Sequence, residues 1–122
     1  MKKILIVDDQ PEVRELVEVT LRSEDCRILQ AETGNDAIKV AKAEKPDVII
    51  MDIMMPGGMD GIEAARILKN DPETKDCTLI MLTAKGQEAD KEEGFNAGAD
   101  DYFVKPFSPL ELITKVDAVL GS

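Results

Sequence analysis

The sequence contains no apolar stretch that approaches the roughly 20 residues needed to cross a membrane. Its amino terminus leads from Met1 almost directly into a short strand-like run, not into the apolar region of a signal peptide. Only two cysteines occur, Cys26 and Cys77, and they lack the CxxC spacing of a metal or redox site. We therefore expect a cytoplasmic protein whose cysteines are small buried residues at strand starts, without a disulfide.

Basic residues are also scarce, because 15 lysines and arginines stand against 25 acids and give a formal net charge of -10. Nucleic acids and anionic membranes are polyanions, so an acidic surface repels both. We expect no nucleic acid and no membrane among the partners of this chain, and expect proteins and cations instead. The length of 122 residues suits one domain, residues 1–122, with a single well-formed core.

Four short apolar runs each end at a polar residue. The runs are 4–7, 48–51, 79–82 and 102–104, and the residues that follow them are Asp8-Asp9, Asp52, Thr83 and Lys105. Continuous aliphatic runs of this length are typical of strands buried on both faces of a parallel sheet. Ligands of open α/β sheets bind at the carboxyl ends of such strands. The sequence therefore predicts that three carboxylates, one hydroxyl and one ammonium converge at one edge.

Segments of helical period separate these strands. The first begins at Pro11 and has an apolar stripe that ends at Leu21, and the second is capped by Thr33 with Asp36. The third has the apolar stripe Ile62, Ala65 and Leu68. The last begins with a capping box at 108–111 and continues with the apolar stripe Leu112, Ile113, Val116, Val119 and Leu120. With a further strand at 27–31, strand and helix alternate five times. This alternation predicts an α/β fold, a doubly wound five-stranded parallel sheet with helices on both faces.

The helix expected over residues 87–97 has the weakest pattern. Its apolar residues are only Ala89, Phe95 and Ala97, and Gly94 lowers its helix propensity further. Two interpretations are open at this point. The helix is either a weakly anchored element that moves, or an ordinary helix with a solvated acidic face.

Three carboxylates at one edge repel one another, since two charges 4 Å apart interact by about 4 kcal/mol at an effective dielectric constant of 20. A Mg²⁺ ion neutralises them, because it prefers oxygen ligands and takes one or two carboxylates directly. Taken alone, Asp8-Asp9 also fits capping residues ahead of the first helix. Asp52 is the best candidate for a nucleophile that forms an aspartyl-phosphate. The Lys105 ammonium and the Thr83 hydroxyl are suited to hold the phosphoryl oxygens.

The chain resembles the receiver domain of two-component response regulators over essentially its whole length. The residues that carry the resemblance are Asp8-Asp9, Asp52-Ile53-Met54-Met55-Pro56 followed by Asp60-Gly61, Thr83-Ala84, and Tyr102-Phe103-Val104-Lys105-Pro106-Phe107. The resemblance implies one receiver domain over 1–122 with the flavodoxin-like strand order 2-1-3-4-5. It also implies a phosphorylation-activated switch, not an enzyme, that assists only its own phosphoryl transfer and slow autodephosphorylation.

The resemblance further implies a role for each site residue. Asp52 is the phosphoacceptor, loaded by a histidine kinase or a histidine phosphotransfer protein, because a chain without histidine cannot be its own donor. Asp9 and Asp52 bind Mg²⁺ directly, the backbone carbonyl of Met54 adds a ligand, and Asp8 acts mainly through water. Lys105 precedes Pro106, and a cis bond there is one way to aim its side chain inward.

Two further residues are implied to form the switch. Thr83 moves toward the phosphoryl group and Tyr102 changes rotamer behind it, so that the face of the fourth helix, fifth strand and fifth helix changes. This face addresses a downstream effector protein, or an effector domain if the chain is a fragment of a longer regulator. A monomer and a phosphorylation-linked dimer both remain open.

The chain departs from the family pattern at two places. The segment 55–61 carries one extra residue between the proline and the Asp60-Gly61 pair, next to Asp52. Met54 and Lys85 stand two residues beyond Asp52 and Thr83, where family members face the route of the hydrolytic water. An apolar side chain and a long one there predict slow autodephosphorylation.

Two other function classes share part of this pattern. A haloacid-dehalogenase-type phosphatase also uses Mg²⁺, an aspartate and a lysine, but it needs Asp-x-Asp where this chain has Asp8-Asp9-Gln10. A flavodoxin-like flavin carrier needs a phosphate loop rich in Ser, Thr and Gly after the first strand. Two aspartates at that place repel a phosphate.

Overall fold

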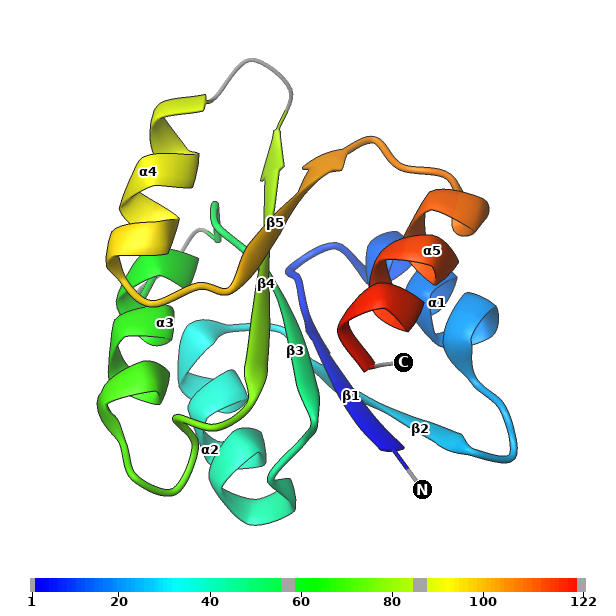
Figure 1. Ribbon diagram of the computed structural model, residues 1–122, viewed down its shortest axis with the longest axis horizontal. Helices are drawn as coiled ribbons and strands as arrows, with labels where there is room; N and C mark the ends of the chain where they lie inside the picture. Colours follow the sequence, from blue (N-terminus) through cyan, green and yellow to red (C-terminus); the bar gives the residue numbers. More distant parts are fainter. Residues whose placement is uncertain (1, 56–58, 85–87, 121–122) are drawn as a thin grey trace.

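The computed structural model describes residues 2–55, 59–84 and 88–120, without the side chains of 88–91 (Figure 1). Within these ranges the strands are β1 (Lys2–Val7), β2 (Cys26–Ala31), β3 (Val48–Asp52), β4 (Thr78–Ala84) and β5 (Asp101–Lys105). The helices are α1 (Pro11–Leu21), α2 (Gly34–Glu44), α3 (Gly61–Asn70), α4 (Glu88–Asn96) and α5 (Pro109–Leu120). All strand pairs are parallel, in the order β2-β1-β3-β4-β5. The predicted fold and strand order are confirmed.

Helices cover both faces of the sheet, α1 and α5 on one side and α2, α3 and α4 on the other (Figure 1). Successive strand residues therefore enter different cores. Leu5, Ile49 and Met81 pack with the α2 and α3 residues, whereas Ile4, Ile50 and Leu82 pack with α1 and α5. Because both faces are buried, the central runs 4–7, 48–51 and 79–82 are apolar at every position and not only at alternate ones.

The predicted helix starts are also found. The Thr33 hydroxyl accepts a hydrogen bond from the Asp36 N–H, and Ser108 and Glu111 form the capping box ahead of α5. The predicted apolar stripe of α5 is wrong at one residue. Leu112 and Val116 are buried as predicted, but Ile113 is 38% exposed. A residue one position after Leu112 is rotated by about 100° around the helix, away from the sheet.

Helix α4 is thinly packed, as its sequence suggests. Phe95 is exposed, and the buried Gly94 brings the helix backbone close to Met81. Whether α4 moves stays a prediction, because thin packing fits both interpretations of this segment.

The two cysteines form no disulfide. Cys26 begins β2 and is half-buried, while Cys77 is buried immediately before β4. In the described part of the chain, no helix combines the length and the apolar character that a membrane span requires.

Candidate functional site

The predicted site residues lie at the carboxyl ends of four strands. Asp8 and Asp9 follow β1, Asp52 is the last residue of β3, Thr83 is the penultimate residue of β4, and Lys105 ends β5. The parallel register aligns these ends, since Asp52 pairs with Leu82, and Ala84 pairs with Lys105. These strand ends lie at one edge of the sheet (Figure 1).

Three carboxylates meet at this edge. Asp8, Asp9 and Asp52 each offer an oxygen atom, and the three oxygens lie within 4.8 Å of one another. Asp8 is fully buried and Asp52 is 6% exposed, whereas Asp9 is open to solvent. A cluster with two buried acids and one exposed acid gives a cation an entrance from the solvent side.

The Lys105 side chain points into the cluster. Its Nζ lies 2.7 Å from Asp8 Oδ2 and 3.2 Å from Asp52 Oδ2. The Lys105-Pro106 peptide bond is cis. The ammonium therefore bridges the two buried carboxylates and offsets part of their mutual repulsion.

The site perturbs the protonation of its own members. Burial, and secondly the charge of Asp8, raise the pKa of Asp52 to about 6, while Lys105 partly opposes the rise. Burial lowers the pKa of Lys105, but its hydrogen bond to Asp8 and the charges of Asp52 and Asp8 outweigh this and raise it. Asp52 is thus a carboxylate whose negative charge is only partly neutralised, as suits a cation ligand or a nucleophile.

Backbone contacts hold Asp52 in place. The Ile53 N–H donates to the Leu82 carbonyl at 3.0 Å, and the Gly61 N–H donates to the Ile53 carbonyl at 3.0 Å. The start of α3 therefore lies directly on the strand end that carries Asp52. A Cβ on Gly61 would overlap the Asp52 carbonyl oxygen, so this position admits only glycine without a backbone shift.

We expect Gly61→Ala to lower the free energy of unfolding by about 2 kcal/mol, because the added methyl group overpacks against backbone. The matched control is Gly94→Ala, where the new Cβ would lie 3.4 Å from Met81 Cγ and a helical alanine is favoured. Urea unfolding measures both variants. Equal stability of the two would contradict the close approach of Gly61 to Asp52.

The two predicted switch residues occupy neighbouring strands. Thr83 is buried, and its hydroxyl makes a long 3.5 Å contact to the Ala84 carbonyl. Tyr102 is half-buried and packs edge to face on Phe95, with ring centroids 5.7 Å apart. Tyr102 therefore links β5 to α4, the thinly packed helix.

Met54 follows Asp52 closely and is 59% exposed. Its N–H donates to Asp52 Oδ1 at 3.2 Å, and the Met54 carbonyl as a metal ligand stays a prediction. The predictions for Lys85 and for the extra residue of the 55–61 segment concern positions outside the described residues.

One residue at the site was not predicted. Arg14 of α1 is 9% exposed, and its guanidinium donates to the Asp8 carbonyl at 2.7 Å. A signal was available in the sequence, since Arg14, Val17 and Leu21 are spaced three and four residues apart and share one helix face. An arginine on a buried face needs polar partners there.

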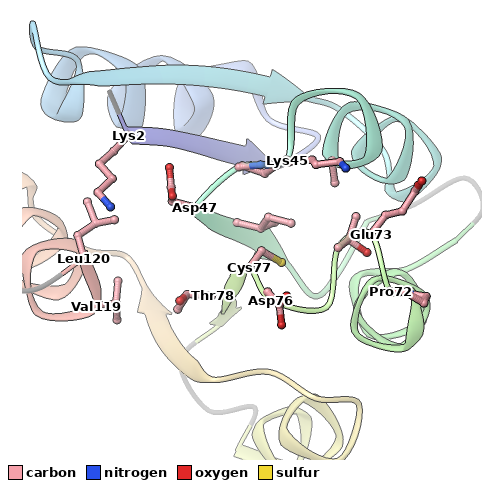
Figure 2. A pocket seen from close by; sticks show the side chains of 14 residues that line it. Lys2, Lys45, Asp47, Pro72, Glu73, Asp76, Cys77, Thr78, Val119 and Leu120 are labelled. Atoms are coloured by element: carbon pink, nitrogen blue, oxygen red, sulfur yellow. The ribbon is translucent and has the colours of Figure 1, made fainter.

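A cavity of about 670 Å³ lies at the opposite, amino-terminal edge of the sheet (Figure 2). Lys2, Lys45, Asp47, Glu73 and Asp76 contribute charged groups of both signs to its rim. No predicted site residue lines it, so the cavity and the acidic cluster are separate features.

The comparisons with known proteins agree with this geometry. The family model described as response regulator receiver domain matches residues 4–117. The phosphate regulon transcriptional regulatory protein PhoB of Pseudomonas aeruginosa is 50% identical over 119 residues, which cover 98% of this chain and 52% of PhoB. The chain thus spans about half the length of this longer relative.

Solved structures match nearly end to end. The chemotaxis response regulator CheY4 of Vibrio cholerae has a TM-score of 0.90 and 34% identity, with 98% of each chain covered. The BeF3-activated DrrB receiver domain has a TM-score of 0.86 and 32% identity, covering 98% of this chain and 97% of that one. The acidic cluster and lysine at the strand ends agree with the family match and with these solved structures. The chain therefore belongs to the response regulator receiver domains of two-component systems.

Proposed function

We propose that this chain is a switch that accepts a phosphoryl group on Asp52 in a Mg²⁺-dependent reaction. The observation that carries the proposal is the position of Asp52 at the end of β3, within 4.8 Å of two further carboxylates and 3.2 Å from Lys105 Nζ. In this proposal the donor is a histidine kinase or a histidine phosphotransfer protein; the chain itself contains no histidine, so it cannot be its own donor.

The residues present fit Mg²⁺. The donor set consists of hard carboxylate oxygens that lie close enough together to share one ion. Asp9 and Asp52 are the direct ligands in this proposal, the Met54 carbonyl is a third, and Asp8 contributes mainly through water. When bound, the ion offsets charge on the phosphoryl oxygens and on Asp52.

The chemistry assigned to the chain itself is a phosphoryl transfer. An Asp52 carboxylate oxygen attacks phosphorus, the P–N bond to the donor imidazole breaks, and its electron pair stays on the histidine nitrogen. The Lys105 ammonium and the Thr83 hydroxyl donate to the phosphoryl oxygens and hold them for attack. Water later attacks the acyl phosphate and releases inorganic phosphate. The chain therefore assists only its own transfer and its own slow autodephosphorylation, and it is not an enzyme with an external substrate.

Phosphorylation adds about -1.5 to -2 charge beside Thr83 and Lys105. Moving a two-state switch from one per cent to ninety-nine per cent active needs about 5.5 kcal/mol. Two new charge-assisted hydrogen bonds, each worth roughly 1.5–3 kcal/mol, supply most of it. Tyr102 connects this event to α4 through Phe95, so the face of α4, β5 and α5 is the proposed output surface.

The output partner is a downstream effector. PhoB is a transcriptional regulatory protein about twice as long as this chain, which supports an effector domain in the same protein. A separate effector protein is the other possibility, and a phosphorylation-linked dimer competes with a monomer. We place the protein in the cytoplasm, together with its proposed kinase.

The direct test is incubation with acetyl phosphate, with and without Mg²⁺, followed by intact-mass measurement. We expect one alkali-labile phosphoryl group per chain, formed only with Mg²⁺. Multiple turnover of an aryl phosphate would favour a phosphatase, and a yellow purified protein would favour a flavin carrier. Either result would contradict the proposed function.

We further expect slow autodephosphorylation, because Met54 is apolar and Lys85 is long where other family members hold side chains that face the hydrolytic water. Met54→Glu should raise the rate of phosphoryl loss about tenfold, a change of roughly 1.4 kcal/mol in the barrier. Val19→Asn is the control, since Val19 is exposed on α1. An unchanged rate in Met54→Glu would count against this role of Met54.

A further inference from the structure

Arg14 is a buried guanidinium with three partners. Its Nη1 donates to the Asp8 carbonyl at 2.7 Å, its Nε donates to Gln30 Oε1 at 3.1 Å, and its Nη2 lies 3.4 Å from Glu32 Oε1. The last contact is a weak ion pair, because the Glu32 side chain is 69% exposed. The shortest bond of this buried cation is therefore the one to the backbone of the acidic cluster.

The Asp8 carbonyl belongs to the peptide group that leads to Asp9. That group is planar, so a fixed carbonyl direction also fixes the bond that enters the Asp9 Cα. The Asp8 residue is tied on its other sides as well, by its N–H to the Ala31 carbonyl at 3.2 Å and by its carboxylate to Lys105. Arg14 completes this set of restraints.

Asp9 depends on its backbone for direction. Among the residues that the structure describes, no side chain or N–H is found to hold the Asp9 carboxylate, whereas Asp8 and Asp52 each accept hydrogen bonds. Asp9 is also the exposed member of the cluster. The restraint nearest to the Asp9 side chain is therefore the preceding peptide group, whose carbonyl Arg14 holds.

We propose that Arg14 is a positioning residue that aims Asp9 at Mg²⁺ through its hydrogen bond to the Asp8 carbonyl. This inference rests on the proposed function, because it assumes that the acidic cluster binds Mg²⁺. Removal of a group that orients a metal ligand without touching the metal typically lowers metal affinity 10- to 100-fold.

Charge alone predicts the opposite effect. Removing the positive charge of Arg14 makes the acidic cluster more negative, and that strengthens the binding of any divalent cation. Loss of positioning weakens binding instead, and it weakens Mg²⁺ more than Ca²⁺, since Mg²⁺ demands near-octahedral geometry and Ca²⁺ accepts a flexible one. The sign of the change in Mg²⁺ affinity, and the ratio of the Mg²⁺ change to the Ca²⁺ change, therefore distinguish a positioning effect from a charge effect.

The experiment compares the purified chain with Arg14→Met and Arg14→Lys by calorimetric titration with Mg²⁺ and with Ca²⁺. Arg14→Met should lose about tenfold in Mg²⁺ affinity and less than about twofold in Ca²⁺ affinity. Arg14→Lys keeps one donor for the Asp8 carbonyl, so it should show a smaller Mg²⁺ loss. Arg27→Met is the matched control, because Arg27 pairs with Glu44 at the far end of β2 and should leave both affinities unchanged.

Urea unfolding without metal checks that each variant folds. If Arg14→Met does not fold, the Mg²⁺-to-Ca²⁺ ratio of Arg14→Lys decides the question. Unchanged or tighter Mg²⁺ binding in the folded variants, or an equal loss for both metals, would overturn the role of Arg14 and leave the proposed function intact. A parent chain that binds no Mg²⁺ would instead overturn the proposed function.

Discussion

Asp52→Asn is expected to abolish phosphorylation by acetyl phosphate in the presence of Mg²⁺. The amide nitrogen is not a nucleophile and the remaining oxygen carries no full negative charge, so neither atom can form the acyl phosphate. Asn and Asp have nearly the same size, and the substitution keeps one of the two oxygens that accept from the Met54 N–H and from Lys105. The variant should therefore fold, and its intact mass should stay that of the unmodified chain.

The matched control for this experiment is Asp76→Asn. Asp76 is exposed in the loop before β4 and lies outside the acidic cluster, so this variant should be modified as fully as the parent chain. A phosphoryl adduct on Asp52→Asn, at the same yield as the control, would place the acceptor on another residue.

The same substitution should stabilise the metal-free protein at neutral pH. The pKa of Asp52 is raised from 3.8 to about 6, which means that the folded state holds the proton more tightly than the unfolded state does. The stability that this group contributes is complete below about pH 4 and is lost as the pH rises through about 6. A shift of this size corresponds to roughly 3 kcal/mol, so Asp52→Asn should gain about 2–3 kcal/mol above pH 7.

Urea unfolding of the parent chain and of Asp52→Asn from pH 4 to pH 8, without metal, measures this gain. The difference between the two should be near zero at pH 4 and should grow toward pH 7. Lys105 does not titrate in this range because its pKa is raised above its ordinary value of 10.5. A difference in stability that does not vary with pH, or a variant that is less stable than the parent chain at pH 8, would contradict the raised pKa of Asp52.

Magnesium should reduce this difference in stability. At a concentration one hundred times its dissociation constant, a ligand that binds only the folded state stabilises it by about 2.7 kcal/mol. The parent chain should gain this amount, and Asp52→Asn should gain less because it has lost one of the three carboxylates that meet at the site.

Much of the site could be predicted from the sequence because of one physical fact. Parallel strands end at the same edge, so Asp8, Asp52 and Lys105 could be assigned to one place from the apolar runs that precede them. The helix caps at Thr33 and Ser108 were equally predictable, since capping depends on residues that are close in sequence.

Contacts between distant parts of the chain were less predictable. The sequence suggested that Lys105 points inward, but it did not show that its ammonium lies closer to Asp8 than to Asp52. The burial of Arg14 and the approach of Gly61 to the Asp52 carbonyl depend on how α1 and α3 pack on the strand ends. Ile113 points outward because the rotation of α5 about its axis is set by packing as well.

The decisive measurement is a crystal structure of the chain with Mg²⁺ and beryllofluoride, a tetrahedral analogue of a phosphoryl group when bound to a carboxylate. We expect beryllium bonded to an Asp52 carboxylate oxygen, one Mg²⁺ ion shared by Asp9 and Asp52, and fluorine atoms within hydrogen-bonding distance of Lys105 and Thr83. Beryllofluoride on a different residue, or a metal ion that touches neither Asp9 nor Asp52, would contradict it.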